Sequence, residues 1–179
     1  MWKKMLLLMG LITALVVPVN AQSVSLGPQV GYYKAQDADA NFMGGVAWRF
    51  KFTPMLGLEA SINYRQEKYA NDALTVRSWP IMVSGLIYPT PLAYGAIGAG
   101  WYNTTMDYDQ EKFSFLKDET TQEFGWHFGG GTELPVGSNL KLTGDIRYVF
   151  LDYDFKEIPG SSNLESNFYV ITIGLLFGL

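Results

Sequence analysis

The chain of 179 residues is 48% hydrophobic and 15% aromatic, carries a formal net charge of −4 and contains no cysteine. A negative charge argues against nucleic acid as a partner, and the missing cysteines exclude disulfides and thiol chemistry. The length fits one domain, which hydrogen bonding and packing alone must hold together.

The N-terminal segment has the layout of a secretory signal peptide. Two lysines precede an apolar run over 5–17, and a small-residue cleavage site follows at 19–21. The run is short for a membrane helix, which needs about 20 residues, and Pro18 ends it. We therefore predict a signal peptide over 1–21 and one mature domain over 22–179.

Residues that alternate between apolar and polar predict eight β-strands. Successive side chains of a strand point to opposite faces, so alternation gives one apolar and one polar face. The clearest strand is 55–69, where Leu58 and its alternate neighbours are apolar and Glu59 begins a polar series. Pro80 predicts a bulge or a missing ladder bond in the fourth strand. In chain order the predicted strands cover 24–33, 45–53, 55–69, 74–88, 93–103, 123–134, 140–150 and 169–179.

The connections between these strands alternate in length. The short ones are 53–54, 89–92 and 135–139, and the long, polar ones are 35–41, 66–74, 106–122 and 156–166. Short turns on one side and long loops on the other are typical of outer-membrane barrels, in which a closed sheet pairs every backbone group. The predicted fold is therefore all-β: an eight-stranded antiparallel up-and-down transmembrane β-barrel.

An exported soluble, lipocalin-like ligand binder is the alternative, because its strands alternate as well, with the apolar face inside. Aromatic residues near the strand ends favour the membrane, where they form girdles at the interfaces. The membrane interpretation predicts a set of residues that face lipid: Trp48, Phe50, Leu58, Ile62, Leu142, Ile146, Ile171, Ile173 and Leu175.

Three stretches resemble a known family. They are "GAIGAGWYNTT" (95–105), the long segment 123–152 and the C-terminal strand, and they resemble the small outer-membrane β-barrel superfamily, the OmpX-like and OmpW-like porin-family proteins. The resemblance implies a monomer in the bacterial outer membrane, in contact with its lipid and lipopolysaccharide and inserted by the barrel-assembly machinery. The residues that match the assembly signal of the family are Thr172, Gly174, Phe177 and Leu179, the last standing where the family usually has phenylalanine.

Some small barrels modify outer-membrane lipid, and their catalytic patterns are missing here. The deacylase pattern needs a serine two residues after a histidine, but the sole histidine, His127, is followed there by Gly129. The palmitoyltransferase pattern needs an Asp-Ser pair, and the sequence has none. We therefore expect no enzyme, cofactor or metal, with a lipid-modifying enzyme as the alternative, and predict a structural or surface-interacting protein or a narrow porin-like conduit.

Charged residues on the inward faces predict a polar network that closes the lumen. An eight-stranded barrel is only just wide enough for its side chains, so charges there must pair or stay hydrated. We expect Glu59, Asp145 and Arg147 at its centre, and a hydrated narrow channel is the alternative. The predicted inward charges are Arg49, Lys51, Glu59, Arg65, Glu67, Arg77, Lys141, Asp145 and Arg147.

Acidic pairs end three of the four strands that lead to the long loops. Carboxylate oxygens suit hard divalent cations, which bridge to lipid phosphates, so a cation-dependent contact with lipopolysaccharide is one interpretation. A solvated acidic rim is the other. The residues are Asp37, Asp39, Asp107, Asp109, Asp152 and Asp154.

Overall fold

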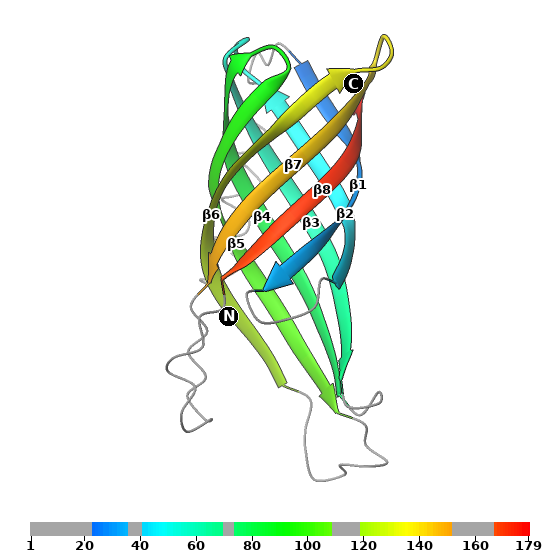
Figure 1. Cartoon of the computed structure of the whole chain (residues 1–179), viewed down its shortest axis with the longest axis vertical. Coiled ribbons are helices and arrows are strands. Elements are labelled where there is room, and N and C mark those ends of the chain that lie inside the picture. The colour runs from blue at the N-terminus through cyan, green and yellow to red at the C-terminus, as the bar shows by residue number, and fades with distance from the viewer. Residues whose placement is uncertain (1–22, 36–40, 70–73, 109–118, 152–166) are drawn as a thin grey trace, which may run out of the picture.

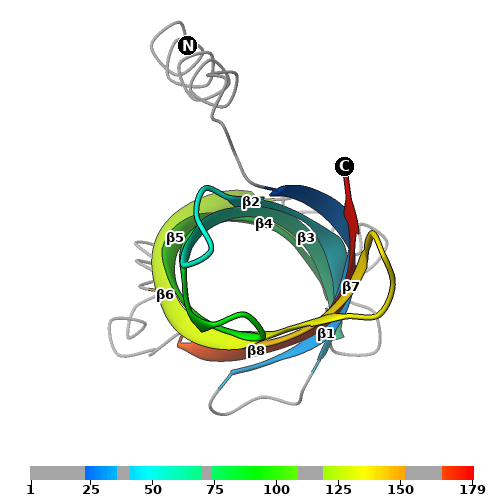
Figure 2. The ribbon, with the colours of Figure 1, turned by 90° about the horizontal axis from the view of Figure 1, so that it is seen from above.

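The computed structural model describes residues 23–35, 41–69, 74–108, 119–151 and 167–179. Their eight strands form one closed antiparallel barrel in sequence order, as Figures 1 and 2 show from the side and from above. The strands are β1 (Ser23–Ala35), β2 (Asn41–Lys51), β3 (Leu56–Tyr69), β4 (Leu74–Thr90), β5 (Ala93–Tyr108), β6 (Glu119–Pro135), β7 (Leu140–Leu151) and β8 (Phe168–Gly178). The predicted eight-stranded antiparallel barrel is confirmed.

The short connections 52–55, 91–92 and 136–139 lie together at one end of the barrel, at the top of Figure 1. We call it the turn end and the opposite end the loop end. The last strand finishes at the turn end, because the Gly178 N–H donates to the Asn139 carbonyl at 2.7 Å. No helix within the described residues is long and apolar enough to cross a membrane.

Closure of the barrel joins the last strand to the first. Val30 in β1 pairs with Ile173 in β8, as the predicted closed barrel requires. If one starts at Ser25 and moves from each residue to its direct partner on the next strand, one circuit of the barrel ends on β1 at Ala35 and not at Ser25. The strands are therefore tilted, and residues at one depth are offset from direct pairing by about one residue per strand.

Several strands extend further toward the loop end than the sequence predicts. β2 begins at Asn41 instead of 45, β5 continues to Tyr108 instead of 103 and β6 begins at Glu119 instead of 123. The ladder is made by backbone groups, so polar residues extend it once neighbouring strands are aligned.

Pro80 interrupts one ladder without a bulge. Ile62 pairs with Ile81 and Arg65 with Ser78 in the same register, and the positions between them, opposite Pro80, are unpaired. Proline has no N–H to donate, so a missing bond is the correct one of the two predicted outcomes.

The apolar faces of the strands point outward and the polar faces point inward. Ile62 is 45% exposed while its neighbour Asn63 is 1% exposed, and Ile146 and Asp145 differ in the same way. This arrangement excludes the soluble alternative, which needs the apolar face inside. The residues predicted to face lipid are all exposed or half-exposed: Trp48, Phe50, Leu58, Ile62, Leu142, Ile146, Ile171, Ile173 and Leu175.

Every strand carries an outward aromatic residue in its half toward the loop end. The eight are Tyr32, Phe42, Tyr64, Trp79, Trp101, Trp126, Phe150 and Tyr169. In the half toward the turn end, the outward aromatics of the described residues lie near β2, at Phe128 of β6 and at Phe177 of β8. Amphipathic rings favour the membrane interface, so the girdle is complete on the loop side and partial on the turn side.

Candidate functional site in the barrel lumen

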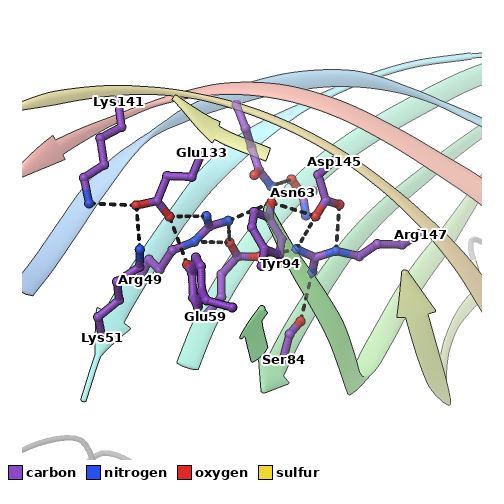
Figure 3. A network of polar contacts seen from close by, with 12 residues as sticks. Arg49, Lys51, Glu59, Asn63, Ser84, Tyr94, Glu133, Lys141, Asp145 and Arg147 are labelled. Atoms are coloured by element: carbon purple, nitrogen blue, oxygen red, sulfur yellow. Dashed lines mark hydrogen bonds and ion pairs between the residues drawn. The ribbon is translucent and has the colours of Figure 1, made fainter. Parts of the chain in front are cut away.

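The inward polar side chains meet in the half of the lumen toward the turn end, where Figure 3 shows them. Arg49 in β2 and Glu59 in β3 are directly paired residues, so both side chains enter the lumen side by side. The Arg49 Nε donates to Glu59 Oε2 at 2.9 Å, and its Nη2 contacts the same oxygen. This pair starts the polar network.

Arg147 in β7 joins the network from the opposite wall. Its Nη2 donates to Glu59 Oε1 at 2.6 Å, its Nε to Asp145 Oδ1 at 2.7 Å and its Nη1 to Ser84 Oγ at 2.9 Å. Glu59 is thus held between two arginines, one on each of its oxygens.

Tyr94 in β5 links Arg49 to Asp145, the carboxylate that also binds Arg147. Its hydroxyl donates to Asp145 Oδ2 at 2.9 Å and accepts from Arg49 Nη2 at 3.1 Å. The Arg49 guanidinium also lies 4.5 Å from the centre of the Tyr94 ring, a favourable cation–π geometry.

Glu133 in β6 is the second buried carboxylate of the network. It accepts hydrogen bonds from Arg49 Nη1 and the Tyr88 hydroxyl, both at 2.9 Å, and from Lys141 Nζ at 2.7 Å. Lys51 Nζ lies 3.1 Å from its Oε1 and 3.7 Å from the Tyr88 ring centre. Sequence reasoning missed Glu133, although the same alternation that put His127 inward extends to it.

Charges in the network are close to balanced, which burial requires. Buried ions are tolerated when they are paired and hydrogen-bonded. Within the part of the chain that the structure describes, the network joins four cations to three anions: Arg49, Lys51, Lys141 and Arg147 with Glu59, Glu133 and Asp145. The arrangement can seal the lumen against ions, because a passing ion must break these pairs.

Of the nine predicted inward charges, the structure brings six together and separates two others, while the side chain of Glu67 lies outside the described residues. Arg65 faces the lumen nearer the loop end, with its guanidinium 4.2 Å from the Tyr33 ring centre and 5.0 Å from that of Phe168. The prediction for Arg77 is wrong: it is exposed and shares the outward face of β4 with Trp79. The six that meet are Arg49, Lys51, Glu59, Lys141, Asp145 and Arg147.

A second layer of inward residues, which sequence reasoning did not single out, is apolar. We call it the apolar plug; it lies nearer the loop end than the polar network. Val149 and Leu151 continue the inward face of Asp145 and Arg147, which was the available signal. The plug consists of Tyr33, Met43, Met82, Tyr102, Val149, Leu151, Phe168 and Val170.

His127 lies in the lumen, as predicted, and is fully buried. Its Nε2 is 2.8 Å from Ser84 Oγ. Ser84 Oγ also accepts from Arg147 Nη1, and its hydroxyl can donate to Nε2 or accept from it, according to the tautomer of His127. Among the described residues, no group of three or more histidine and acidic side chains is placed to hold a metal ion.

The residues predicted as an assembly signal lie on the closing strand. Thr172 and Gly174 face inward and Phe177 outward, and the Leu179 N–H donates to the Val24 carbonyl at 3.0 Å. Their role in assembly stays a prediction. The side chains of the six acidic-pair residues, Asp37, Asp39, Asp107, Asp109, Asp152 and Asp154, lie outside the described part of the chain.

Several solved outer-membrane barrels share this fold. A major outer membrane protein from Thermus thermophilus is 14% identical, with a TM-score of 0.66 over 88% of this chain and 98% of that one. The N-terminal β-barrel domain of Pseudomonas aeruginosa OprF is 12% identical, with a TM-score of 0.59 over 87% and 97%. Ail, the attachment invasion locus protein of Yersinia pestis, is 13% identical, with a TM-score of 0.56 over 88% and 97%.

A search of curated protein sequences finds no significant match. The sequence profile of the family described as "Outer membrane protein beta-barrel domain" matches residues 5–177. That span covers nearly the whole chain and agrees with the resemblance in the sequence. The chain therefore belongs to the outer membrane protein beta-barrel domain family, and its barrel is one of the bacterial outer membrane.

Proposed function

We propose that the protein is a non-enzymatic outer-membrane barrel with a closed lumen, a membrane-embedded scaffold rather than an open pore. The observation that carries this proposal is the chain of ion pairs from Glu133 through Arg49, Glu59 and Arg147 to Asp145. Its members come from β2, β3, β6 and β7, so the chain crosses the lumen from wall to wall. Removing one partner of such a buried pair is strongly unfavourable, which keeps the network closed at rest.

The apolar plug supports the same proposal at a second depth. The Phe168 ring contacts the rings of Tyr33 and Tyr102 edge-to-face, with centroids 6.1 Å and 5.9 Å apart. A hydrophobic constriction stops ions by excluding the water that hydrates them. Opening a pore therefore requires two layers to be removed, a charged one and an apolar one.

The environment of His127 argues against an enzyme. Ser84 and His127 are within hydrogen-bonding distance, but a serine hydrolase also needs a carboxylate that orients the other ring nitrogen. Among the described residues, no group makes a hydrogen bond to His127 Nδ1. Both residues are buried in the lumen, where a lipid substrate has no access to them.

Planar-bilayer recording of the purified protein tests the closed lumen. We expect no steady conductance from wild type, from Glu59→Ala/Arg147→Ala or from Tyr102→Ala/Phe168→Ala, because each variant keeps one closed layer. The combination of all four substitutions is expected to conduct. Heat-modifiable mobility on gels verifies that each variant is folded. A steady wild-type conductance that none of these substitutions raises contradicts the proposal and identifies a narrow conduit.

The setting of this scaffold is part of the proposal. We infer an N-terminal signal peptide over 1–21, insertion by the barrel-assembly machinery and a monomer surrounded by lipid and lipopolysaccharide. The outward aromatic residues on all eight strands support the contact with lipid. Mass spectrometry of protein purified from outer membranes tests the cleavage after Ala21 directly.

A further inference from the structure

Where the polar network meets the apolar plug, one level of the lumen carries four inward glycines. His127 pairs directly with Gly98, and Asn63 with Gly45. Once strand tilt is allowed for, further inward glycines lie at a similar depth. The inward residues at this level are Gly31, Gly45, Asn63, Gly98, Gly100 and His127, together with Met82, Arg147 and Val170 of the adjoining layers. Side chains normally fill an eight-stranded barrel, and glycines contribute none.

The two polar side chains of this level lie along the walls. A Cβ added at Gly98 would come within 2.8 Å of His127 Nε2, and one at Gly45 would collide with Asn63 Oδ1. Each side chain therefore lies over the glycine of a neighbouring strand instead of reaching across the lumen. The Asn63 Oδ1 accepts a hydrogen bond of 2.7 Å from the Gln29 Nε2.

Three polar atoms at or beside this level are buried without a protein partner. They are His127 Nδ1, Asn63 Nδ2 and Ser61 Oγ, on side chains that are at most 5% exposed. Buried polar groups in native proteins nearly always have a hydrogen-bond partner, from the protein or from ordered water. Asn63 Nδ2 is an N–H donor, Ser61 Oγ is a hydroxyl, and His127 Nδ1 is a donor or an acceptor according to the tautomer.

We propose that this level is a water-binding chamber in the middle of the lumen, here called the chamber. Water suits it because a water molecule both donates and accepts, so it can serve the Asn63 amide, the Ser61 hydroxyl and either tautomer of His127, and buried waters typically make about three such bonds. A cation is disfavoured by the Asn63 Nδ2 donor and the guanidinium of Arg147, and an anion by Glu59 and Asp145. Hydration of the chamber does not depend on whether the barrel conducts ions.

The sole histidine makes the chamber directly observable. In full-length protein in lipid nanodiscs, with ¹⁵N-histidine and ¹³C-methyl methionine, we expect water-to-ring cross-relaxation at His127. The Met43 methyl, which belongs to the apolar plug, is the internal control and should show none; Met43→Leu assigns it. Absence of water contact at the His127 ring overturns the proposal.

If exchange broadens the His127 signal, the stability of Ser61→Ala decides. In a hydrated chamber the substitution removes a water-bound hydroxyl, so the midpoint of urea unfolding falls or stays unchanged. In a dry lumen it removes an unsatisfied polar group, so the midpoint rises, and that result overturns the proposal. Ser78→Ala is the reference variant: the Ser78 hydroxyl accepts a protein hydrogen bond from Thr104, so its change in midpoint shows the effect of removing a hydroxyl that has a partner.

Discussion

Arg147 and Glu59 are joined by a 2.6 Å hydrogen bond although they lie 88 positions apart in the chain. Arg147 is in β7 and Glu59 in β3, which stand on opposite sides of the ring of strands. The contact therefore spans the lumen and ties the two walls together. The contact can form only when the barrel is closed, so its loss would report on opening of the ring.

Neutralising Glu59 should destabilise the barrel strongly. Glu59→Gln leaves Arg49 and Arg147 without their shared carboxylate, and loss of one partner of a buried pair costs about 3–5 kcal/mol. Lys141→Gln is the matched control: Lys141 is 29% exposed, and Glu133 keeps its other partners, so its loss should cost less than about 1 kcal/mol. Urea unfolding in lipid vesicles measures both. Equal effects would contradict a network centred on Glu59.

Ile62→Arg should block assembly much more than Asn63→Arg. The Ile62 side chain faces lipid and Asn63 faces the lumen, and arginine facing the bilayer midplane costs about 2–4 kcal/mol. The fraction of heat-modifiable, folded protein in outer membranes is the measurement. Equal losses, or a greater loss for Asn63→Arg, would contradict the assignment of the two faces.

Gly129→Ala should prevent or greatly weaken folding, whereas Gly144→Ala should be tolerated. A Cβ at the inward-facing Gly129 would lie 2.7 Å from the Arg147 Cα and collide with the Ile146 carbonyl. At the outward-facing Gly144 the nearest atom is 3.7 Å away, and alanine there should stabilise the strand by up to about 1 kcal/mol. Thermal unfolding followed by gel mobility separates the two variants. Tolerance of Gly129→Ala would show that the strands are less closely spaced there.

Divalent cations should raise the thermal stability of the wild type in membranes that contain lipopolysaccharide. Carboxylate pairs favour calcium and magnesium, so a variant with asparagine at the acidic pairs should lose the effect. Membranes of phospholipid alone are the control. If the cations leave both proteins equally unchanged, the pairs are a solvated rim. The substituted residues are Asp37, Asp39, Asp107, Asp109, Asp152 and Asp154.

Much of the fold follows from local patterns in the sequence. Alternation along the chain assigns Leu58 and Ile62 to one face and Glu59 and Asn63 to the other, because the strand period depends only on backbone geometry. The number of strands and the alternation of short and long connections follow in the same way. Alternation alone does not say whether the apolar face points inward or outward; the aromatic residues near the strand ends indicated that it points outward.

The interior depended on the tertiary structure. Arg77 was misplaced because β4 is apolar on both faces: Trp79 and Ile81 face lipid while Met82 belongs to the apolar plug, so alternation carries little information there. Glu133 was missed although its strand alternates clearly. Which inward charges meet is set by closure, ring order and tilt, since the pairing of Glu59 with Arg147 joins opposite walls. Such contacts leave no periodic trace in the chain, because their partners are brought together only by the complete ring.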